Sequence, residues 1–186
     1  MTRIFTTLAA LDALALLLTY ASGWISRARD AAQHSNVDPT FQIHFLLALF
    51  TAFLTLLVHC LIFTYFLGTG RWVKEVALAY QFPDDPLPKR TRELKRHSFP
   101  PALTAMLVTI AAAAAGAAAQ RAVWPWWVHF TLATATLLAN AWAFPVEYRD
   151  LRSNVGVLDE VMREVDRIRA RRGLPTNVEA LRQETG

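Results

Sequence analysis

The apolar positions of this sequence fall into four long runs, each of about the length that a helix needs to cross a bilayer. Such a helix takes roughly 20 mostly apolar residues. The runs are Ile4 to Trp24, Phe41 to Leu67, Pro101 to Ala119 and Val123 to Val146. This pattern predicts an all-α integral membrane protein with four transmembrane helices, which form one domain of residues 1–148.

Basic residues are distributed unevenly between the segments that join these runs. Sixteen of the 19 Lys and Arg residues precede the first run, lie between the second and third, or follow the fourth. Only Arg27, Arg29 and Arg121 lie in the other two segments. Since cytoplasmic loops carry an excess of Lys and Arg, we expect both termini to be cytoplasmic, in a bacterial-type inner membrane.

The segments between the runs carry helical signals of their own. Gly68-Thr69-Gly70 predicts the end of the second span. Residues 71–82 then predict an amphipathic interfacial helix on the inner leaflet, within a cytoplasmic loop of residues 71–98. Ser98, which precedes Pro100 and Pro101, predicts the start of the third span.

Residues 149–186 predict a cytoplasmic helical tail with an amphipathic helix. Its apolar residues follow a 3-4-3 spacing, here called the seam: Leu158, Val161, Val165 and Ile168. Two heptads are too few for a free coiled coil, so the seam is expected to contact the membrane domain, a second copy or another subunit. Gly173-Leu174-Pro175 predicts the end of this helix, and Thr176 with Glu179 has the spacing of a capping box.

Composition narrows the class of protein further. Apolar residues make up 54% of the chain and charged residues 18%, with a mean hydropathy of +0.25, which excludes an ordinary soluble domain. The single cysteine, Cys60, excludes a disulfide scaffold. The net charge of +4 is explained by the basic cytoplasmic segments and anionic lipid, so no nucleic-acid partner is expected. No P-loop, HExxH, GxSxG or CxxCH motif is present, so no catalytic residue is assigned.

Polar residues inside the spans form two similar stripes. The second and fourth spans align on their histidines, with polar or small residues at offsets of 4, 7 and 11, which keeps each set on one helical face. The stripes are His44, Ala48, Thr51 and Thr55 in one span, and His129, Ala133, Thr136 and Asn140 in the other. This similarity is what a parallel duplication of a helical hairpin would leave.

Three interpretations of these polar residues stay open. Small and hydroxyl side chains allow close helix packing, and buried His and Asn then only hydrogen-bond across helices. Alternatively, His44 and His129 lie at one depth and are axial ligands of a b-type haem, beside a quinone, for electron transfer. His59, further along the second span, is then a candidate ligand of a second, incomplete cofactor site. In the third interpretation Asp12, His59 and Thr55 serve a small oligomeric channel or a proton-coupled transporter, with His59 or Asn140 as the partner of Asp12.

The function that the sequence favours first is a structural or accessory subunit of a larger membrane complex. The run Ala111 to Ala119 has almost no side-chain bulk, so another helix must come close to it. Together with the seam, this face predicts contacts with other membrane subunits or with further copies of the chain, in addition to the lipid bilayer.

Overall fold

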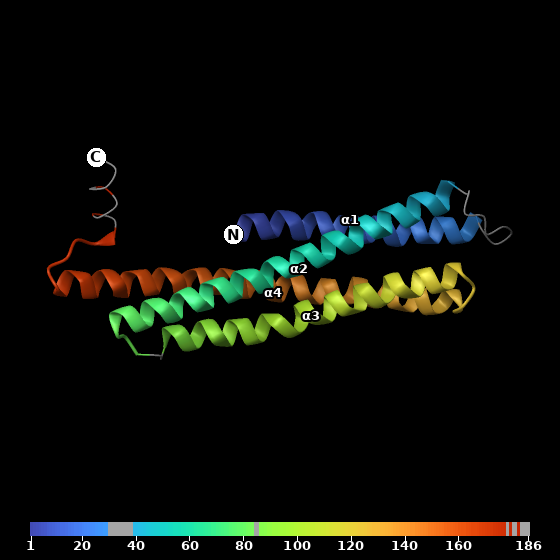
Figure 1. Ribbon diagram of the computed structural model, residues 1–186. Helices are drawn as coiled ribbons and strands as arrows, with labels where there is room; N and C mark the ends of the chain where they lie inside the picture. The colour runs from blue at the N-terminus through green and yellow to red at the C-terminus, as the bar shows by residue number, and fades with distance from the viewer. Residues whose placement is uncertain (30–38, 84–85, 178, 180–181, 183–186) are drawn as a thin grey trace. The chain divides into compact units, whose positions relative to one another are not determined.

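The computed structural model describes residues 1–29, 39–83, 86–177, 179 and 182. It contains four helices in chain order, α1 (Thr2–Arg29), α2 (Pro39–Tyr80), α3 (Leu87–Gln120) and α4 (Trp126–Arg171) (Figure 1). No strand occurs among these residues. The prediction of an all-α chain is confirmed.

The chain folds into two compact units. Unit 1 comprises Met1–Phe63 and Ser98–Arg149, and unit 2 comprises Thr64–His97 and Asp150–Gly186. Helix α1 belongs to unit 1 alone, whereas α2, α3 and α4 each contribute a part to both units.

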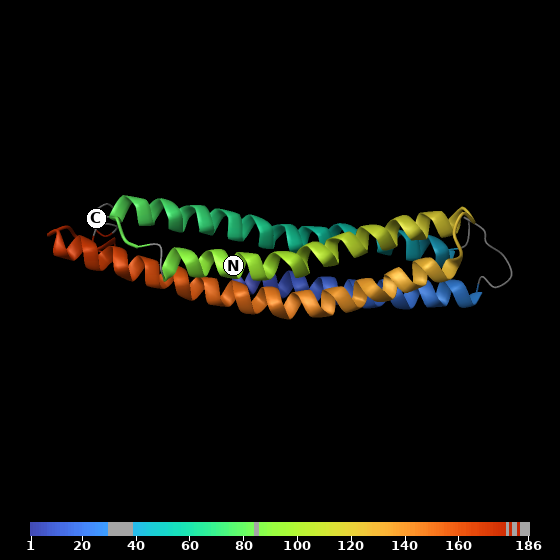
Figure 2. The same cartoon turned by 90° about the horizontal axis from the view of Figure 1, so that it is seen from below.

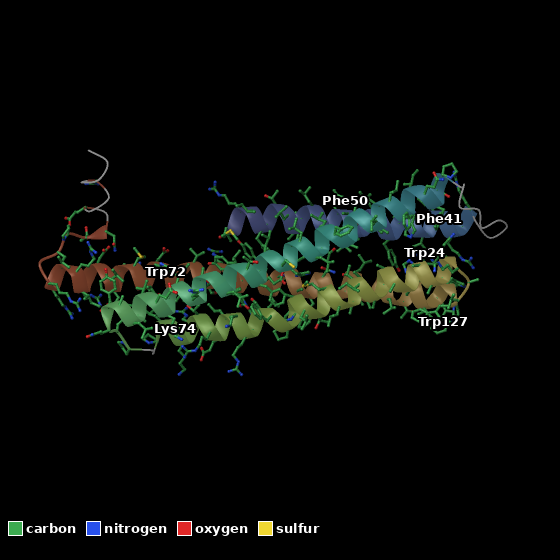
Figure 3. All side chains as sticks on the ribbon, viewed as in Figure 1. Trp24, Phe41, Phe50, Trp72, Lys74 and Trp127 are labelled. Carbon is green, nitrogen blue, oxygen red and sulfur yellow. The ribbon has the colours of Figure 1, made fainter. Side chains whose placement is uncertain are left out.

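Unit 1 consists of two consecutive antiparallel hairpins, α1 with α2 and α3 with α4. The ends of α1 and α3 and the starts of α2 and α4 meet at one end of this unit (Figures 1 and 2). Trp24, Phe41 and Trp127 lie at that end (Figure 3). The Trp24 and Phe130 rings meet edge to face with centres 5.0 Å apart, and the Arg27 guanidinium lies 4.8 Å from the centre of the Trp126 ring.

Three of the described helices, α1, α2 and α3, are long and apolar enough to cross a membrane. Their outer faces expose large apolar side chains such as Leu17, Phe53 and Leu107. Helix α4 is not among the three, although the sequence predicts a span there. The reason is composition, because His129, Asn140 and several threonines lower the mean hydropathy of its first half.

Helix α2 does not end at Gly68-Thr69-Gly70, which corrects the prediction of a separate interfacial helix. It continues without a break to Tyr80. Glycine costs about 1 kcal/mol in a helix, but tertiary contacts offset this here. Asn154 of α4 donates to the Thr69 hydroxyl at 3.1 Å, and Val73 in the next turn is completely buried.

Helix α3 also starts earlier than predicted, at Leu87, and contains both Pro100 and Pro101. A proline inside a helix removes one hydrogen bond and clashes with the preceding turn. In this region the helix is held by its neighbours, because Ser98 and Ala102 are completely buried and the Phe99 ring packs on Phe63 at 4.4 Å. Ser98 therefore lies in the middle of a helix and not at its N-cap.

The seam of the tail is covered within unit 2. Helix α4 continues into the tail without interruption to Arg171. Val73 of α2 forms a buried cluster with Val157 and Val161, and partly buried apolar side chains of the same unit surround it: Val76, Phe82, Leu87, Leu94 and Leu158. The seam is therefore not an unpartnered face, because its inward side already contacts α2 and α3.

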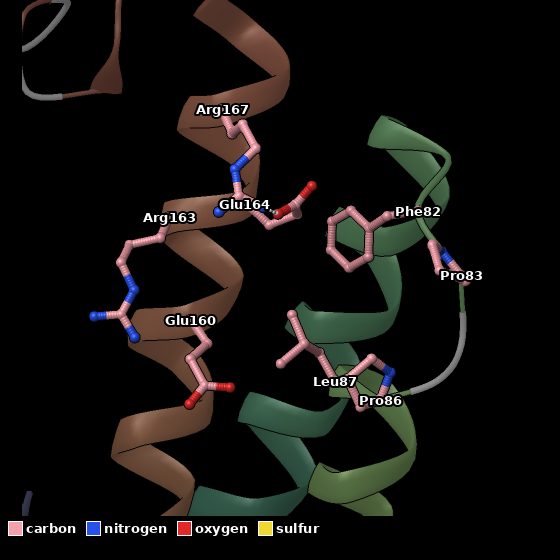
Figure 4. Close-up of a pocket in the computed structure, with 8 residues that line it drawn as sticks. All are labelled: Phe82, Pro83, Pro86, Leu87, Glu160, Arg163, Glu164 and Arg167. Carbon is pink, nitrogen blue, oxygen red and sulfur yellow. Dashed lines mark hydrogen bonds and ion pairs between the residues drawn. The ribbon is translucent and has the colours of Figure 1, made fainter.

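A surface groove of about 330 Å³ lies beside this cluster. The turn between α2 and α3 supplies its apolar wall, and a charged stretch of α4 supplies the other (Figure 4). Its lining residues are Phe82, Pro83, Pro86, Leu87, Glu160, Arg163, Glu164 and Arg167.

The end of α4 agrees with the sequence prediction. Gly173 adopts a φ of 69°, and Leu174 N–H donates to the carbonyl of Arg169 at 3.0 Å, which closes the helix.

The capping box predicted at Thr176 and Glu179 is confirmed as well. Thr176 N–H donates to the Glu179 carboxylate at 2.8 Å, and Glu179 N–H donates to the Thr176 hydroxyl at 3.3 Å. These hydrogen bonds lower the pKa of Glu179. The predicted helix that follows lies partly outside the described residues.

Candidate functional site

A group of five buried polar side chains lies inside unit 1. They come from three helices, α1, α2 and α4, and three of them are ionisable: Asp12, Thr55, His59, Asn140 and Glu147. Ionisable groups are seldom buried without a partner, because desolvation of a charge is costly. We call these five residues the polar cluster.

His59 is the centre of the polar cluster and has a partner at each ring nitrogen. Its Nε2 lies 2.9 Å from Asn140 Oδ1, and its Nδ1 lies 2.7 Å from Glu147 Oε1. The Asn140 amide group donates to the carbonyl of Thr136 at 2.9 Å, which orients its oxygen towards His59. Because an amide oxygen only accepts, Nε2 of His59 carries a proton.

The second contact of His59 therefore holds one further proton between two groups. Either the imidazolium donates to a Glu147 carboxylate, or a protonated Glu147 donates to a neutral imidazole. Both forms have the same heavy-atom contacts and no net charge. The proton can thus move between Nδ1 and Oε1 without rearrangement of the side chains.

Asp12 supplies a second carboxyl group to the polar cluster. Its Oδ1 accepts a hydrogen bond from the Thr55 hydroxyl at 2.9 Å, and its charge acts on the His59 imidazole. Its other oxygen, Oδ2, is buried and has no hydrogen-bond partner among the described residues. One acceptor position inside the bundle is therefore open to a proton or a water molecule.

The walls around His59 are apolar. The Phe144 ring stacks on the imidazole with ring centres 5.5 Å apart, and the nearby positions of α2 and α4, Val58, Ile62 and Ala143, are apolar and almost completely buried. Such walls exclude bulk water, which strengthens the electrostatic interactions within the cluster.

Further hydroxyl groups lie between the polar cluster and the end of unit 1 at which the two hairpins turn. Thr19 and Thr51 share a hydrogen bond of 2.7 Å, and Tyr20 and Thr134 share one of 3.0 Å. Thr136 donates to the carbonyl of Leu132 within its own helix. Thr51 and Thr55 lie one helical turn apart on the inward face of α2, so hydroxyl groups occupy two successive turns of this helix.

His44 and His129 face each other near the same end. Their ring centres are 6.2 Å apart, with an angle of 67° between the planes. His44 Nδ1 lies 3.2 Å from the carbonyl of Thr19, and His129 Nδ1 lies 2.9 Å from the carbonyl of Ala112. The two side chains expected at one depth thus lie close together.

The structure extends the stripe similarity beyond the positions that the sequence suggests. Buried residues of α2 recur in α4 at a constant separation of 85 residues. The pairs are Thr51 with Thr136, Thr55 with Asn140, Val58 with Ala143, Ile62 with Glu147, and Phe66 with Leu151. Helices α1 and α3 show the same relation at a separation of 93 residues, with Phe5, Ala9, Asp12 and Leu16 corresponding to Ser98, Ala102, Ala105 and Thr109. This burial pattern is what a duplicated hairpin produces.

Four residues of the polar cluster are expected from the sequence, namely Asp12, Thr55, His59 and Asn140. Glu147 is not expected, and neither is the hydrogen-bond partner of Asp12. Glu147 lies one residue beyond the predicted fourth span, although its position seven residues after Asn140 places it on the same stripe. The direct partner of Asp12 is Thr55, rather than His59 or Asn140 as expected. Both of these lie in the same cluster, but neither hydrogen-bonds to Asp12.

A bare metal ion has few ligands available. Among the described residues, no three or more His, Cys, Asp or Glu side chains form a group that could hold a metal.

Comparisons with protein-family models, with curated proteins and with solved structures give no match for this chain.

Proposed function

We propose that this chain is a four-span protein of a bacterial-type inner membrane, with both termini cytoplasmic, whose polar cluster binds and relays a proton inside the bundle. The observation that carries this proposal is the contact between His59 and Glu147, which holds a proton between two groups of no net charge. Ionisable residues inside membrane-spanning bundles are costly, and they mark ion and proton pathways.

Asp12 gives the relay a place to accept the next proton. A carboxylate at Asp12 attracts the positive charge of a protonated His59, and a proton that arrives at the open Oδ2 removes this attraction. Proton uptake at Asp12 therefore favours the form in which His59 is neutral and Glu147 holds the shared proton. The two carboxyl groups are coupled through one imidazole.

The position of α4 within the bundle supports a fourth span despite its lower hydropathy. Its polar residues Thr136 and Asn140 are buried, whereas Leu138 and Trp142 are exposed. A helix that directs its polar side chains into the bundle and its apolar ones outwards is compatible with lipid contact.

A separate proposal is that this chain is a structural or accessory subunit of a larger membrane complex. One surface still supports it, the alanine-rich face of α3. The seam already contacts α2 and α3 of the same chain, so it is not available for a partner. The alanine-rich face of α3 is the surface that another subunit would contact. Part of this face, including Ala113, Ala114 and Ala117, is exposed.

The proton relay is tested by proton flux into liposomes that contain the purified chain, driven by a potassium diffusion potential and read with an internal pH dye. We expect flux from the unmodified protein, and loss of most of it in Asp12→Asn and Glu147→Gln. Both substitutions keep the side-chain shape and a hydrogen-bonding oxygen, but they remove the group that exchanges a proton.

Glu164→Gln is the matched control, because it makes the same chemical change at a partly exposed carboxylate of unit 2 that pairs with Arg167. Its flux should equal that of the unmodified protein. Unchanged flux in both Asp12→Asn and Glu147→Gln, with the proteins folded, would show that the polar cluster only packs the helices.

A further inference from the structure

The two hairpins of unit 1 hold a histidine in the same way. In the first, His44 from α2 bonds to the Thr19 carbonyl of α1, and its ring lies over Gly23. In the second, His129 from α4 bonds to the Ala112 carbonyl of α3, and its ring lies over Gly116. In both cases the glycine follows the carbonyl by four residues. Each imidazole thus lies against a carbonyl and a glycine of the neighbouring helix, and we call this pair of groups its seat.

The close approach of the imidazole ring favours glycine at both positions. A Cβ atom at Gly23 would lie 2.9 Å from Cε1 of His44, and one at Gly116 would lie 3.0 Å from Cε1 of His129. Contacts this short force a neighbour to move. A larger residue at either position would therefore require the imidazole ring to shift.

The seats determine which ring nitrogen carries the proton. A backbone carbonyl only accepts hydrogen bonds, so Nδ1 of both histidines is the donor. Ser22 lies 3.1 Å from His44 Nδ1 and donates its own hydroxyl proton to the Thr19 carbonyl, which agrees with this assignment. Nε2 of each neutral ring consequently presents a lone pair. Neither Nε2 has a hydrogen-bond partner within the ranges that the structure describes.

This arrangement is that of a metal ligand whose orientation is set by its other nitrogen. Metal-binding histidines commonly donate the remaining N–H to a carbonyl or carboxylate, which fixes the tautomer and the ring direction. With metal–nitrogen bonds of about 2 Å, two imidazoles on opposite sides of one ion have ring centres about 6 Å apart. The rings of His44 and His129 are 6.2 Å apart.

The number of ligands distinguishes between the possible metal centres. Structural zinc takes four protein ligands and catalytic zinc three, whereas no group of three ligands occurs in the described part of the chain. An iron porphyrin needs only two axial ligands from the protein. Ala48 and Ala133, one turn further along each stripe, limit the bulk beside the two rings.

We infer that His44 and His129 form a bis-imidazole site for a haem iron, held between the two hairpins by their carbonyl and glycine seats. This site is separate from the polar cluster and shares no residue with it. The two proposals can therefore fail independently.

The test is a visible absorption spectrum of the full chain, purified from haem-supplied cells or titrated with haemin, before and after reduction with dithionite. We expect a Soret band, and sharp α and β bands on reduction. Both features should be lost in His44→Ala and His129→Ala. In His129→Gly, added imidazole should restore the bands, which separates the loss of a ligand from the loss of folding.

Two matched variants sharpen the result. His97→Ala removes a half-exposed histidine of unit 2 that pairs with Asp150, and should leave the spectrum unchanged. Gly116→Ala should weaken the bands although it removes no ligand, because it displaces the His129 ring.

Three outcomes would overturn the inference: a colourless protein that takes up no haemin, a spectrum that survives both His44→Ala and His129→Ala, or two-histidine binding of Cu²⁺ or Zn²⁺ by a protein that rejects haemin. Loss of the bands in Glu147→Gln would show instead that the haem binds at the polar cluster.

Discussion

Asn140 shows how a single amide group sets the chemistry of the polar cluster. Its NH₂ group donates to the Thr136 carbonyl, so its oxygen faces His59 and holds a proton on Nε2. At the equivalent position of the first hairpin, α2 carries Thr55, which donates to Asp12. The two corresponding positions therefore differ in role: one accepts a hydrogen bond from an imidazole, and the other donates one to a carboxyl group.

Asn140→Leu tests this role, because it has a similar volume but removes the acceptor of His59 Nε2. A buried donor without a partner costs about 1–3 kcal/mol. We therefore expect the free energy of unfolding to fall by about 2 kcal/mol, measured by denaturant titration in detergent. Thr131→Val, a substitution at an exposed threonine of the same helix, serves as the control. A change no larger than that of the control would contradict the hydrogen-bond assignment.

The helices illustrate where sequence reasoning succeeds and where it does not. The end of α4 before Gly173 and the capping box at Thr176 depend on local chemistry, and both agree with the prediction. The continuation of α2 through Gly68 and Gly70, and of α3 through its prolines, depends on contacts with residues far away in the sequence. Local signals cannot reveal such contacts.

The same distinction explains which parts of the site could be predicted. Periodicity alone places His44, Thr51 and Thr55 on one face of a helix, and the structure brings them into the bundle. Glu147 could not be chosen in the same way, because a carboxylate at the end of an apolar run ordinarily marks the membrane surface. Its burial follows from the position of α4 against α2, which no local pattern reports.

Gly68→Ala tests the continuity of α2. A Cβ atom added at Gly68 meets nothing within 4 Å, and alanine favours the helix over glycine by about 1 kcal/mol. We expect the free energy of unfolding to rise by up to this amount. Gly116→Ala should raise it less than Gly68→Ala does, because the new Cβ atom would lie 3.0 Å from Cε1 of His129 and the ring must shift. A destabilised Gly68→Ala protein would indicate that the chain bends at this position.

The molecule as a whole is expected to cross the membrane four times, although α4 lacks the hydropathy of the other helices. The duplicated burial pattern favours this count, since α4 repeats the inward face of α2. A membrane-crossing α4 would place Glu160 on the cytoplasmic side and the turn at Ala122 on the opposite side.

Cysteine labelling tests this topology in a Cys60→Ser background. A membrane-impermeant maleimide should label Glu160→Cys in inverted vesicles but not in intact spheroplasts. It should label Ala122→Cys with the reverse preference. Labelling of both positions from one side would exclude a membrane-spanning α4.

The most direct test of a proton shared between His59 and Glu147 is the protonation state of His59 in the bilayer. It is measured by ¹⁵N solid-state NMR of the histidine-labelled chain. We expect Nε2 to be protonated and the Nδ1 resonance to lie between the protonated and unprotonated positions. In Glu147→Gln, the Nδ1 resonance should move to one of these two positions. An unprotonated Nε2, or an Nδ1 resonance that does not respond to Glu147→Gln, would contradict a proton shared between His59 and Glu147.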